Sequence, residues 1–207
     1  MKLSIGISPC PNDTFIFDAM LHGKIDTEGL AFDLRLEDVE TLNRLAITGV
    51  LDITKVSYGA LPRLFPHYRV LDAGGALGKG VGPLFISKNF QEVSALDPTK
   101  CKIIIPGSYT TAHLLFHLAH PEFTSKIFLP FDQIEEAVMN GHADAGIIIH
   151  ESRFTYAEKG LNKLEDLGDT WESNTGFPIP LGGIIAKRHF DIELLRKINR
   201  VIKRSLE

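Results

Sequence analysis

His150 is the residue of this 207-residue chain whose type and position most directly indicate acid–base chemistry. It follows the apolar run 145–149 (Ala-Gly-Ile-Ile-Ile), which is typical of a buried strand. An imidazole at the end of such a strand can accept or donate a proton near neutral pH. Spacing alone leaves an alternative open, in which His150 has satisfied hydrogen bonds and no catalytic role.

A second candidate is the segment 107–112 (Gly-Ser-Tyr-Thr-Thr-Ala), between a predicted strand at 103–105 and a predicted helix at 110–119. At such a junction, hydroxyl and backbone N–H groups converge where the helix dipole favours an anion. A carboxylate fits that chemistry. Ordinary helix capping by Ser108 or Thr110 is the alternative.

Two further loops carry polar groups at strand ends. Ser57 closes another predicted strand and offers a comparable hydroxyl, with plain capping again the alternative. The segment 8–14 (Ser-Pro-Cys-Pro-Asn-Asp-Thr) has two prolines that restrict the backbone, and it places Asn12 or Asp13 at a helix start. Nothing in the sequence indicates a lowered thiol pKa for Cys10, so a structural role is favoured over a nucleophilic one.

Metal and nucleotide sites have little support in the sequence. His113, His117 and His120 stand at helical spacing, and a histidine pair four residues apart can bind zinc. The first two lie on the polar side of the predicted helix, however, and no HExxH pattern supplies a carboxylate. Dinucleotide, P-loop and nucleophile-elbow patterns are also missing. We therefore predict no metal and no cofactor.

The elements that would position these residues occur twice along the chain. A strand, a polar turn and a helix at 3–22 are matched by the same order at 103–119. Each half continues with a helix, a glycine and a strand, and the Gly-x-x-Asp spacing at 49–52 recurs at 141–144. The sequence therefore predicts two similar α/β lobes with largely parallel sheets, whose ligands bind beyond the carboxyl ends of the strands.

Two more predicted strands, 82–88 and 182–187, resemble each other and lie at the ends of the two halves. The chain could cross between the lobes there. On that basis the first lobe comprises residues 1–90 and 182–207, and the second comprises residues 91–181.

Composition excludes several classes of function. The chain has 22 Lys and Arg against 26 Asp and Glu, so no large positive field is available to bind nucleic acid. Its two cysteines form no CxxC pattern, which indicates thiols in a reducing compartment. No apolar segment is long enough for a signal sequence or a membrane span. We expect a cytoplasmic protein with a small-molecule ligand and no membrane partner.

The motifs identified above are similar to those of a known family. At residues 8–15 the sequence resembles the 1,4-dihydroxy-6-naphthoate synthases of the futalosine route to menaquinone, relatives of chorismate dehydratase. The resemblance covers nearly the whole chain, because it continues through four further segments: 55–58 (Lys-Val-Ser-Tyr), 107–113, 146–151 and 178–183.

This resemblance implies a two-lobed fold like that of the periplasmic binding proteins of type II, with a cleft between the lobes. It also implies a lyase that converts cyclic dehypoxanthinyl futalosine to 1,4-dihydroxy-6-naphthoate and releases a three-carbon fragment without a known cofactor. His150 matches the family's proposed proton acceptor. The expected substrate-binding residues are Asn12, Lys55, Val56, Ser57, Thr110, Thr111 and Ala112.

Two alternatives and one departure accompany this expectation. A non-catalytic protein that binds a small carboxylate could have the same fold, and so could an enzyme like chorismate dehydratase, against which the 8–15 loop argues. Family members continue beyond the position of Glu207, so the chain is expected to be shortened at its C-terminus. Apolar surface left uncovered by that shortening would favour a homo-oligomer.

Overall fold

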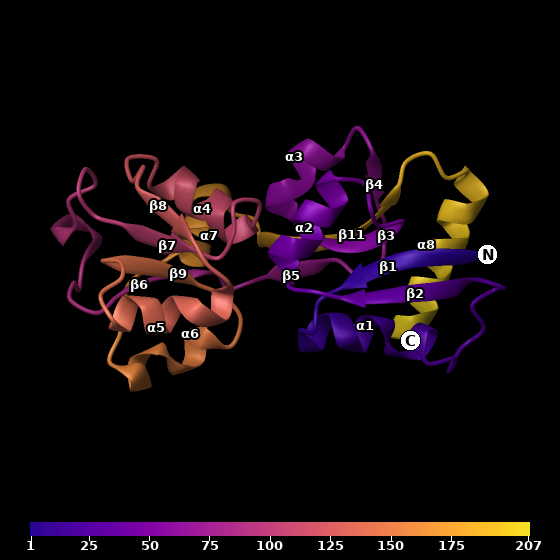
Figure 1. Ribbon diagram of the computed structural model, residues 1–207, viewed down its shortest axis with the longest axis horizontal. Coiled ribbons are helices and arrows are strands. Elements are labelled where there is room, and N and C mark those ends of the chain that lie inside the picture. Colours follow the sequence, from indigo (N-terminus) through magenta and orange to yellow (C-terminus); the bar gives the residue numbers. More distant parts are fainter. The chain divides into compact units, whose positions relative to one another are not determined.

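The computed structural model describes residues 1–207 as two α/β units, the first comprising residues 1–76 and 181–207 and the second residues 77–180 (Figure 1). The first unit and its boundaries contain β1 (Lys2–Ile7), α1 (Pro11–Leu21), β2 (Ala31–Leu36), α2 (Val39–Ile47), β3 (Ile53–Ser57), η1 (Tyr58–Ala60), α3 (Leu61–Leu64), β4 (Tyr68–Val70), β5 (Ala76–Gly78), β11 (Ile179–Lys187) and α8 (Ile192–Leu206). The second contains β6 (Leu84–Ser87), η2 (Val93–Ala95), β7 (Ile103–Ile105), α4 (Thr111–Ala119), β8 (Lys126–Phe128), η3 (Phe131–Gln133), α5 (Ile134–Met139), β9 (Ala145–Ile148), α6 (Ser152–Thr155), η4 (Tyr156–Lys159), β10 (Asn162–Asp166) and α7 (Leu167–Thr175).

The two units share one strand topology. In the first, β1 lies between its parallel neighbours β2 and β3, and in the second, β7 lies between its parallel neighbours β8 and β9. Antiparallel strands complete each sheet, with β11 and β4 beyond β3, and β6 and β10 beyond β9. The sequence predicted largely parallel sheets, but both sheets are mixed. The reason is that β11 and β6, near the crossings between the units, run antiparallel to β3 and β9.

The recurring Gly-x-x-Asp spacing has the same structural role in both units. Gly49 and Gly141 adopt φ angles of +71° and +73°, which a glycine tolerates directly after a helix. Asp52 then accepts hydrogen bonds from the backbone N–H and hydroxyl of Ser4 in β1. Asp144 accepts one from the N–H of Lys102, next to β7. Each aspartate ties the start of one parallel strand to its neighbour.

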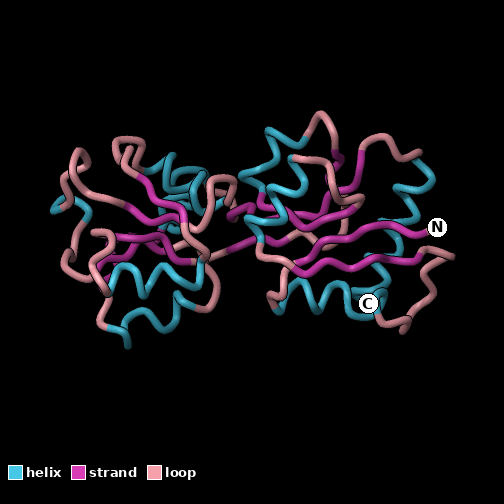
Figure 2. The backbone as a smooth tube through the Cα atoms, viewed as in Figure 1, coloured by secondary structure: helices cyan, strands magenta, loops and turns pink.

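Helices cover both faces of each sheet (Figures 1 and 2). In the first unit, α1 and α8 pack together on one face, while α2 lies on the other, where Gly6 of β1 leaves room for Leu42 and Leu51. In the second, α5 and α6 lie on one face and α4 and α7 on the other. No helix has both the length and the apolar character that a bilayer crossing requires.

The first crossing between the units differs from the predicted one, whereas the second lies within one residue of its predicted position. Strand 82–88 was expected to end the first lobe, but β6 is paired with β9 and β10 in the second sheet. The first crossing lies instead at residues 76–77, within β5, which pairs with β11. The second lies at 180–181, within β11. Similar apolar strands can belong to different sheets, because local pattern does not specify a partner.

His120 joins the carboxyl end of α4 to β10 in the second unit. Its Nε2 lies 2.5 Å from Glu165 Oε2, and its ring packs among Phe85, Phe116 and Phe123. The hydrogen bond to Glu165 raises the pKa of His120, and the same bond lowers the pKa of Glu165. The aromatic rings partly shield the imidazole from water, which strengthens the hydrogen bond.

We expect the free energy of unfolding to fall as the pH rises through the raised pKa of folded His120. The contribution of a raised histidine pKa is complete below the ordinary value of 6.5 and is lost above the folded value. The contribution of Glu165 is complete above its ordinary value of 4.5 and is lost below its lowered folded value. The pair is therefore most stabilising between pH 4.5 and 6.5.

Urea denaturation across this pH range measures the effect. His120→Gln should flatten the decline above pH 6.5, whereas His142→Gln, at an exposed position, should retain it. An unchanged decline in His120→Gln would show that another group is responsible.

Candidate functional site

The loops that follow β1 and β3 leave the first sheet at the same edge. The two strands are parallel neighbours, with Gly6 opposite Thr54, so both carboxyl ends meet there. The first loop leads through Ser8 into α1, and the second leads from Ser57 into η1. The structure thus brings together two segments that the sequence singled out separately.

A buried ion pair connects these segments. Lys55 Nζ lies 2.7 Å from Asp13 Oδ1, and the two side chains are only 8% and 3% exposed. Asp13 Oδ2 accepts hydrogen bonds from the hydroxyl of Ser8, at 2.7 Å, and from its backbone N–H, at 3.1 Å. Asp13 also lies in the first turn of α1, where the helix dipole favours a carboxylate. The lysine, the loop and the helix are therefore held by one carboxylate.

Ser57 is oriented by a buried amide. Its backbone N–H donates to Asn43 Oδ1 at 2.9 Å, and Asn43 Nδ2 donates to its hydroxyl oxygen at 3.2 Å. Asn43 belongs to α2 and is completely buried. Because the Ser57 oxygen accepts this bond, its own hydroxyl proton can be donated to a different acceptor.

Two glycines of β11 make space beside these residues. A Cβ atom at Gly182 would lie 3.1 Å from Lys55 Cε and 2.8 Å from the carbonyl oxygen of Val56. One at Gly183 would lie 3.0 Å from the Tyr58 hydroxyl. The two glycines of the 178–183 motif lie opposite β3 because any larger residue there would collide with Lys55, Val56 or Tyr58.

The remaining predicted residues of the first unit have different environments. Asn12 is exposed in the first turn of α1. Val56 is completely buried, backbone included, so the residue belongs to the core. Cys10 and Cys101 form no disulfide, and burial is the main cause of the raised pKa of the Cys101 thiol.

Removing either charge of the buried pair should destabilise the chain. We expect Asp13→Asn or Lys55→Met to lower the free energy of unfolding by about 3–5 kcal/mol, because the partner's charge stays buried alone. The double variant should lose less than the sum of the two single losses. Urea denaturation measures all three.

The matched control is Lys2→Met, which breaks the pair with Asp33 in side chains that are 67% and 69% exposed. Little change is expected there, because exposed ion pairs contribute little to stability. Additive losses in the double variant of Asp13 and Lys55 would contradict the coupling between them.

In the second unit, the 107–112 segment and His150 also lie at one sheet edge. They follow β7 and β9, which are parallel neighbours with Ile104 opposite Gly146. Thr110 caps α4, because its hydroxyl oxygen accepts from the N–H of His113 at 3.1 Å and its proton is donated to Gly107 O at 3.0 Å. Capping by Thr110, left open by the sequence, is therefore present, and it fixes the loop at the amino end of the helix. Thr111 and Ala112 are buried at the start of α4.

His113 holds the same loop from the other side. Its Nδ1 lies 2.9 Å from the carbonyl oxygen of Ser108, so this nitrogen carries the proton. Nε2 then accepts from Lys126 Nζ at 3.3 Å. Burial, as the largest effect, lowers the pKa of His113, which favours this neutral form. Sequence reasoning considered His113 only as a metal ligand and missed its role in the loop.

His150 is exposed at the end of β9 and has a φ angle of +59°. Its ring meets that of Phe131 edge to face, with centroids 4.9 Å apart. A residue other than glycine adopts this backbone conformation rarely, and such residues are common at functional sites. Phe131 was not predicted, since nothing in the local pattern links it to His150.

The histidines that the sequence analysis weighed as metal ligands and rejected have protein partners. His117 lies beside His113 and near Lys126, and His120 binds Glu165 and Glu122. No group of three or more His, Cys, Asp and Glu side chains has an arrangement that could hold a metal ion.

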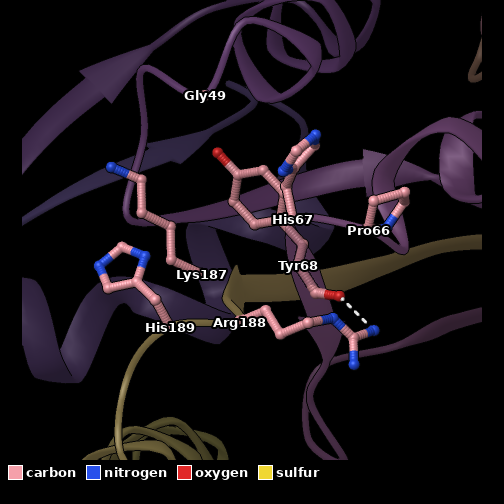
Figure 3. A pocket seen from close by; sticks show the side chains of 7 residues that line it. All are labelled: Gly49, Pro66, His67, Tyr68, Lys187, Arg188 and His189. Carbon is pink, nitrogen blue, oxygen red and sulfur yellow. Dashed lines mark hydrogen bonds between the residues drawn. The ribbon is translucent and has the colours of Figure 1, made fainter.

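A pocket of about 370 Å³ lies away from these predicted residues, at the amino end of β3 (Figure 3). The lysine and the arginine of this pocket already have partners within the protein. Lys187 pairs with Asp52 at 3.1 Å, and Arg188 donates to the carbonyl oxygens of Phe65 and Tyr68. Burial, followed by the nearby Asp52 charge, raises the pKa of Tyr68 to about 12, so its hydroxyl stays neutral. The pocket is lined by Gly49, Pro66, His67, Tyr68, Lys187, Arg188 and His189.

Comparison with known sequences shows extensive similarity. The family described as Menaquinone biosynthesis matches residues 3–207. A 1,4-dihydroxy-6-naphtoate synthase of Thermus thermophilus is 44% identical over 99% of this chain and 73% of its own length. One of Streptomyces coelicolor is 41% identical over 99% of this chain and 72% of its own length.

Solved structures support the fold. A crystal structure of a protein from Archaeoglobus fulgidus matches 99% of this chain and 75% of that one, with 39% identity and a TM-score of 0.90. The alkanesulfonate-binding protein of Xanthomonas axonopodis pv. citri, bound to MOPS, matches 99% of this chain and 72% of its own, with 13% identity and a TM-score of 0.70. The second likeness concerns the fold alone and confirms the predicted α/β fold of the type II periplasmic-binding-protein kind.

Proposed function

Because the chain belongs to the menaquinone biosynthesis family, we propose that it is an enzyme that forms 1,4-dihydroxy-6-naphthoate. The observation that carries this proposal is the 44% and 41% identity, over nearly the whole chain, to two enzymes with that name. The proposed substrate is cyclic dehypoxanthinyl futalosine. The reaction is a carbon–carbon lyase reaction that releases a three-carbon fragment and uses no cofactor, and its proposed location is the cytoplasm.

The carboxylate of the substrate is proposed to bind at the amino end of α4. Thr110, Thr111 and Ala112 lie there, and the helix dipole favours negative charge at this position. The hydroxyl of Thr110 is already bound within the loop, so this residue acts by fixing the backbone. A loop held by Thr110 and His113 needs little reorganisation when the anion binds.

In the first unit, Ser57 is the proposed donor to an oxygen of the substrate. Asn43 donates to the serine oxygen, so the hydroxyl proton stays available for donation to the substrate. Lys55 is proposed to contribute mainly through its position, because Asp13 already balances its charge. Asn12 is exposed in the first turn of α1 and completes the proposed contacts. Val56 is proposed to act by holding β3 in place between Lys55 and Ser57, because it is completely buried.

His150 is the proposed general base. A neutral imidazole removes a proton from the substrate, which starts cleavage of the carbon–carbon bond, and formation of the aromatic ring favours the later steps. The exposure of His150 leaves its ring accessible to a small molecule. The two predicted alternatives are not favoured, because the relatives are named for naphthoate synthesis and similarity to binding proteins extends to the fold only.

Direct assay tests the reaction. Incubation with cyclic dehypoxanthinyl futalosine should increase naphthoate absorbance and release the three-carbon fragment, which mass spectrometry identifies. Bound substrate recovered unchanged would contradict the proposal and favour a binding protein. Turnover of the chorismate dehydratase substrate in its place would favour the second alternative.

His150→Asn should lower kcat by about 10² to 10⁴-fold, because a positioned base contributes roughly that factor. The affinity for a substrate analogue should change much less, since the carboxylate-binding groups remain. His189→Asn, at an exposed position in the other unit, is the matched control and should retain full activity. Equal turnover in His150→Asn would remove His150 from the mechanism.

A further inference from the structure

Glu135 is a buried acid to which the proposed reaction assigns no role. It lies in α5 and is 6% exposed. Its Oε2 accepts hydrogen bonds from the Ser152 hydroxyl at 3.0 Å and from Lys159 Nζ at 2.7 Å. Its Oε1 is also buried and accepts no hydrogen bond. Because burying a carboxylate is costly, this placement requires an explanation.

Both partners of Glu135 lie in the segment that directly follows His150. Ser152 is the first residue of α6, and Lys159 is the last residue of η4. One carboxylate therefore ties both ends of the segment 152–159 to α5.

The helix that carries Glu135 is itself fixed against the strand that precedes His150. A Cβ atom at Gly146 of β9 would lie only 2.7 Å from Ile134 Cγ2, so α5 and β9 pack as closely as glycine allows. Phe131, directly before α5 in η3, contacts the imidazole of His150. The stretch formed by η3 and α5 thus contacts the strand before His150 (β9), the helix after it (α6) and the imidazole itself.

The backbone of His150 needs such support. Its φ angle of +59° belongs to a sparsely populated region, and a residue stays there only when its surroundings hold it. Arg153 supplies a second attachment, because its guanidinium donates to Gly82 O at 2.6 Å and to Asp166 Oδ2 at 2.7 Å. Ser152 and Arg153 are the first two residues of α6, so both attachments act directly next to this turn.

We propose that Glu135 is a positioning residue for His150. By accepting the hydrogen bond of Ser152, Glu135 fixes the backbone turn at residue 150. Phe131, four residues earlier, sets the direction of the ring from the same stretch. The inference rests on the proposed role of His150 as the general base. Glu135 acts through Ser152 and the backbone, because a base must be held in place for its reaction geometry.

Kinetics of two variants test this role. Ser152→Ala and Glu135→Ala should lower kcat by about 10-fold to 100-fold, the effect of a misplaced catalytic group. KM should change by less than about threefold, because the proposed carboxylate site at 107–112 is unaffected. Glu135→Gln keeps an acceptor for Ser152 and should restore most of the lost kcat.

Glu136→Ala is the matched control, since Glu136 is the exposed neighbour on the same helix and should leave kcat unchanged. Thermal denaturation of every variant identifies any loss of folding. Ser152→Ala removes a single hydroxyl and keeps the test valid if Glu135→Ala does not fold. A kcat of folded Ser152→Ala within about twofold of the unmodified chain would overturn the proposal.

A measurement independent of turnover separates this inference from the proposed function. The NMR shifts of the His150 ring, assigned by their loss in His150→Asn, report its contact with Phe131. The chemical shifts of the His150 ring should change in Ser152→Ala and Glu135→Ala. They should keep their original values in Glu135→Gln and Glu136→Ala. Unchanged shifts in the first two variants would overturn the positioning role. Full activity of His150→Asn would instead contradict the proposed base, while the shifts still decide whether Glu135 orients the ring.

Discussion

The candidate site of the first unit depends on the buried ion pair between Asp13 and Lys55. A charge without a partner in this environment is strongly unfavourable, so the two residues must stay together. Because Asp13 also binds Ser8, the pair joins the end of β1, the first turn of α1 and the strand β3. Ser57, two residues beyond Lys55, is therefore held at a sheet edge that is already fixed.

The second unit fixes the equivalent edge with neutral groups. Thr110 caps α4 through its hydroxyl, and His113 donates to the loop from an imidazole whose pKa burial lowers. Neither group introduces a carboxylate at the amino end of the helix, so the dipole of α4 stays available for an anionic ligand. With the same βαβ topology, the first unit has a neutralised ion pair between Asp13 and Lys55 at this edge. The second unit has the amino end of α4, where a negative charge is favoured.

Local signals predicted much of this arrangement. The strand 103–105 and the helix after Thr110 have short-range signatures, an apolar run and a capping hydroxyl, and the structure has them within a residue. The Gly-x-x-Asp spacing identified the repeated topology, because its glycine and aspartate each have a local task. By contrast, β2 and β10 were not predicted, since their residues are mostly exposed or partly exposed and lack an apolar run.

The pattern of residues established two α/β units, the loops that carry polar groups and the position of His150 at a strand end, because these features depend on neighbours within a few residues. The tertiary structure decided which groups hold those loops. Asp13 meets Lys55 across 42 positions of sequence, and Glu135 meets Ser152 across 17. Such contacts depend on burial and on which strands become neighbours, and both arise only when distant segments pack together.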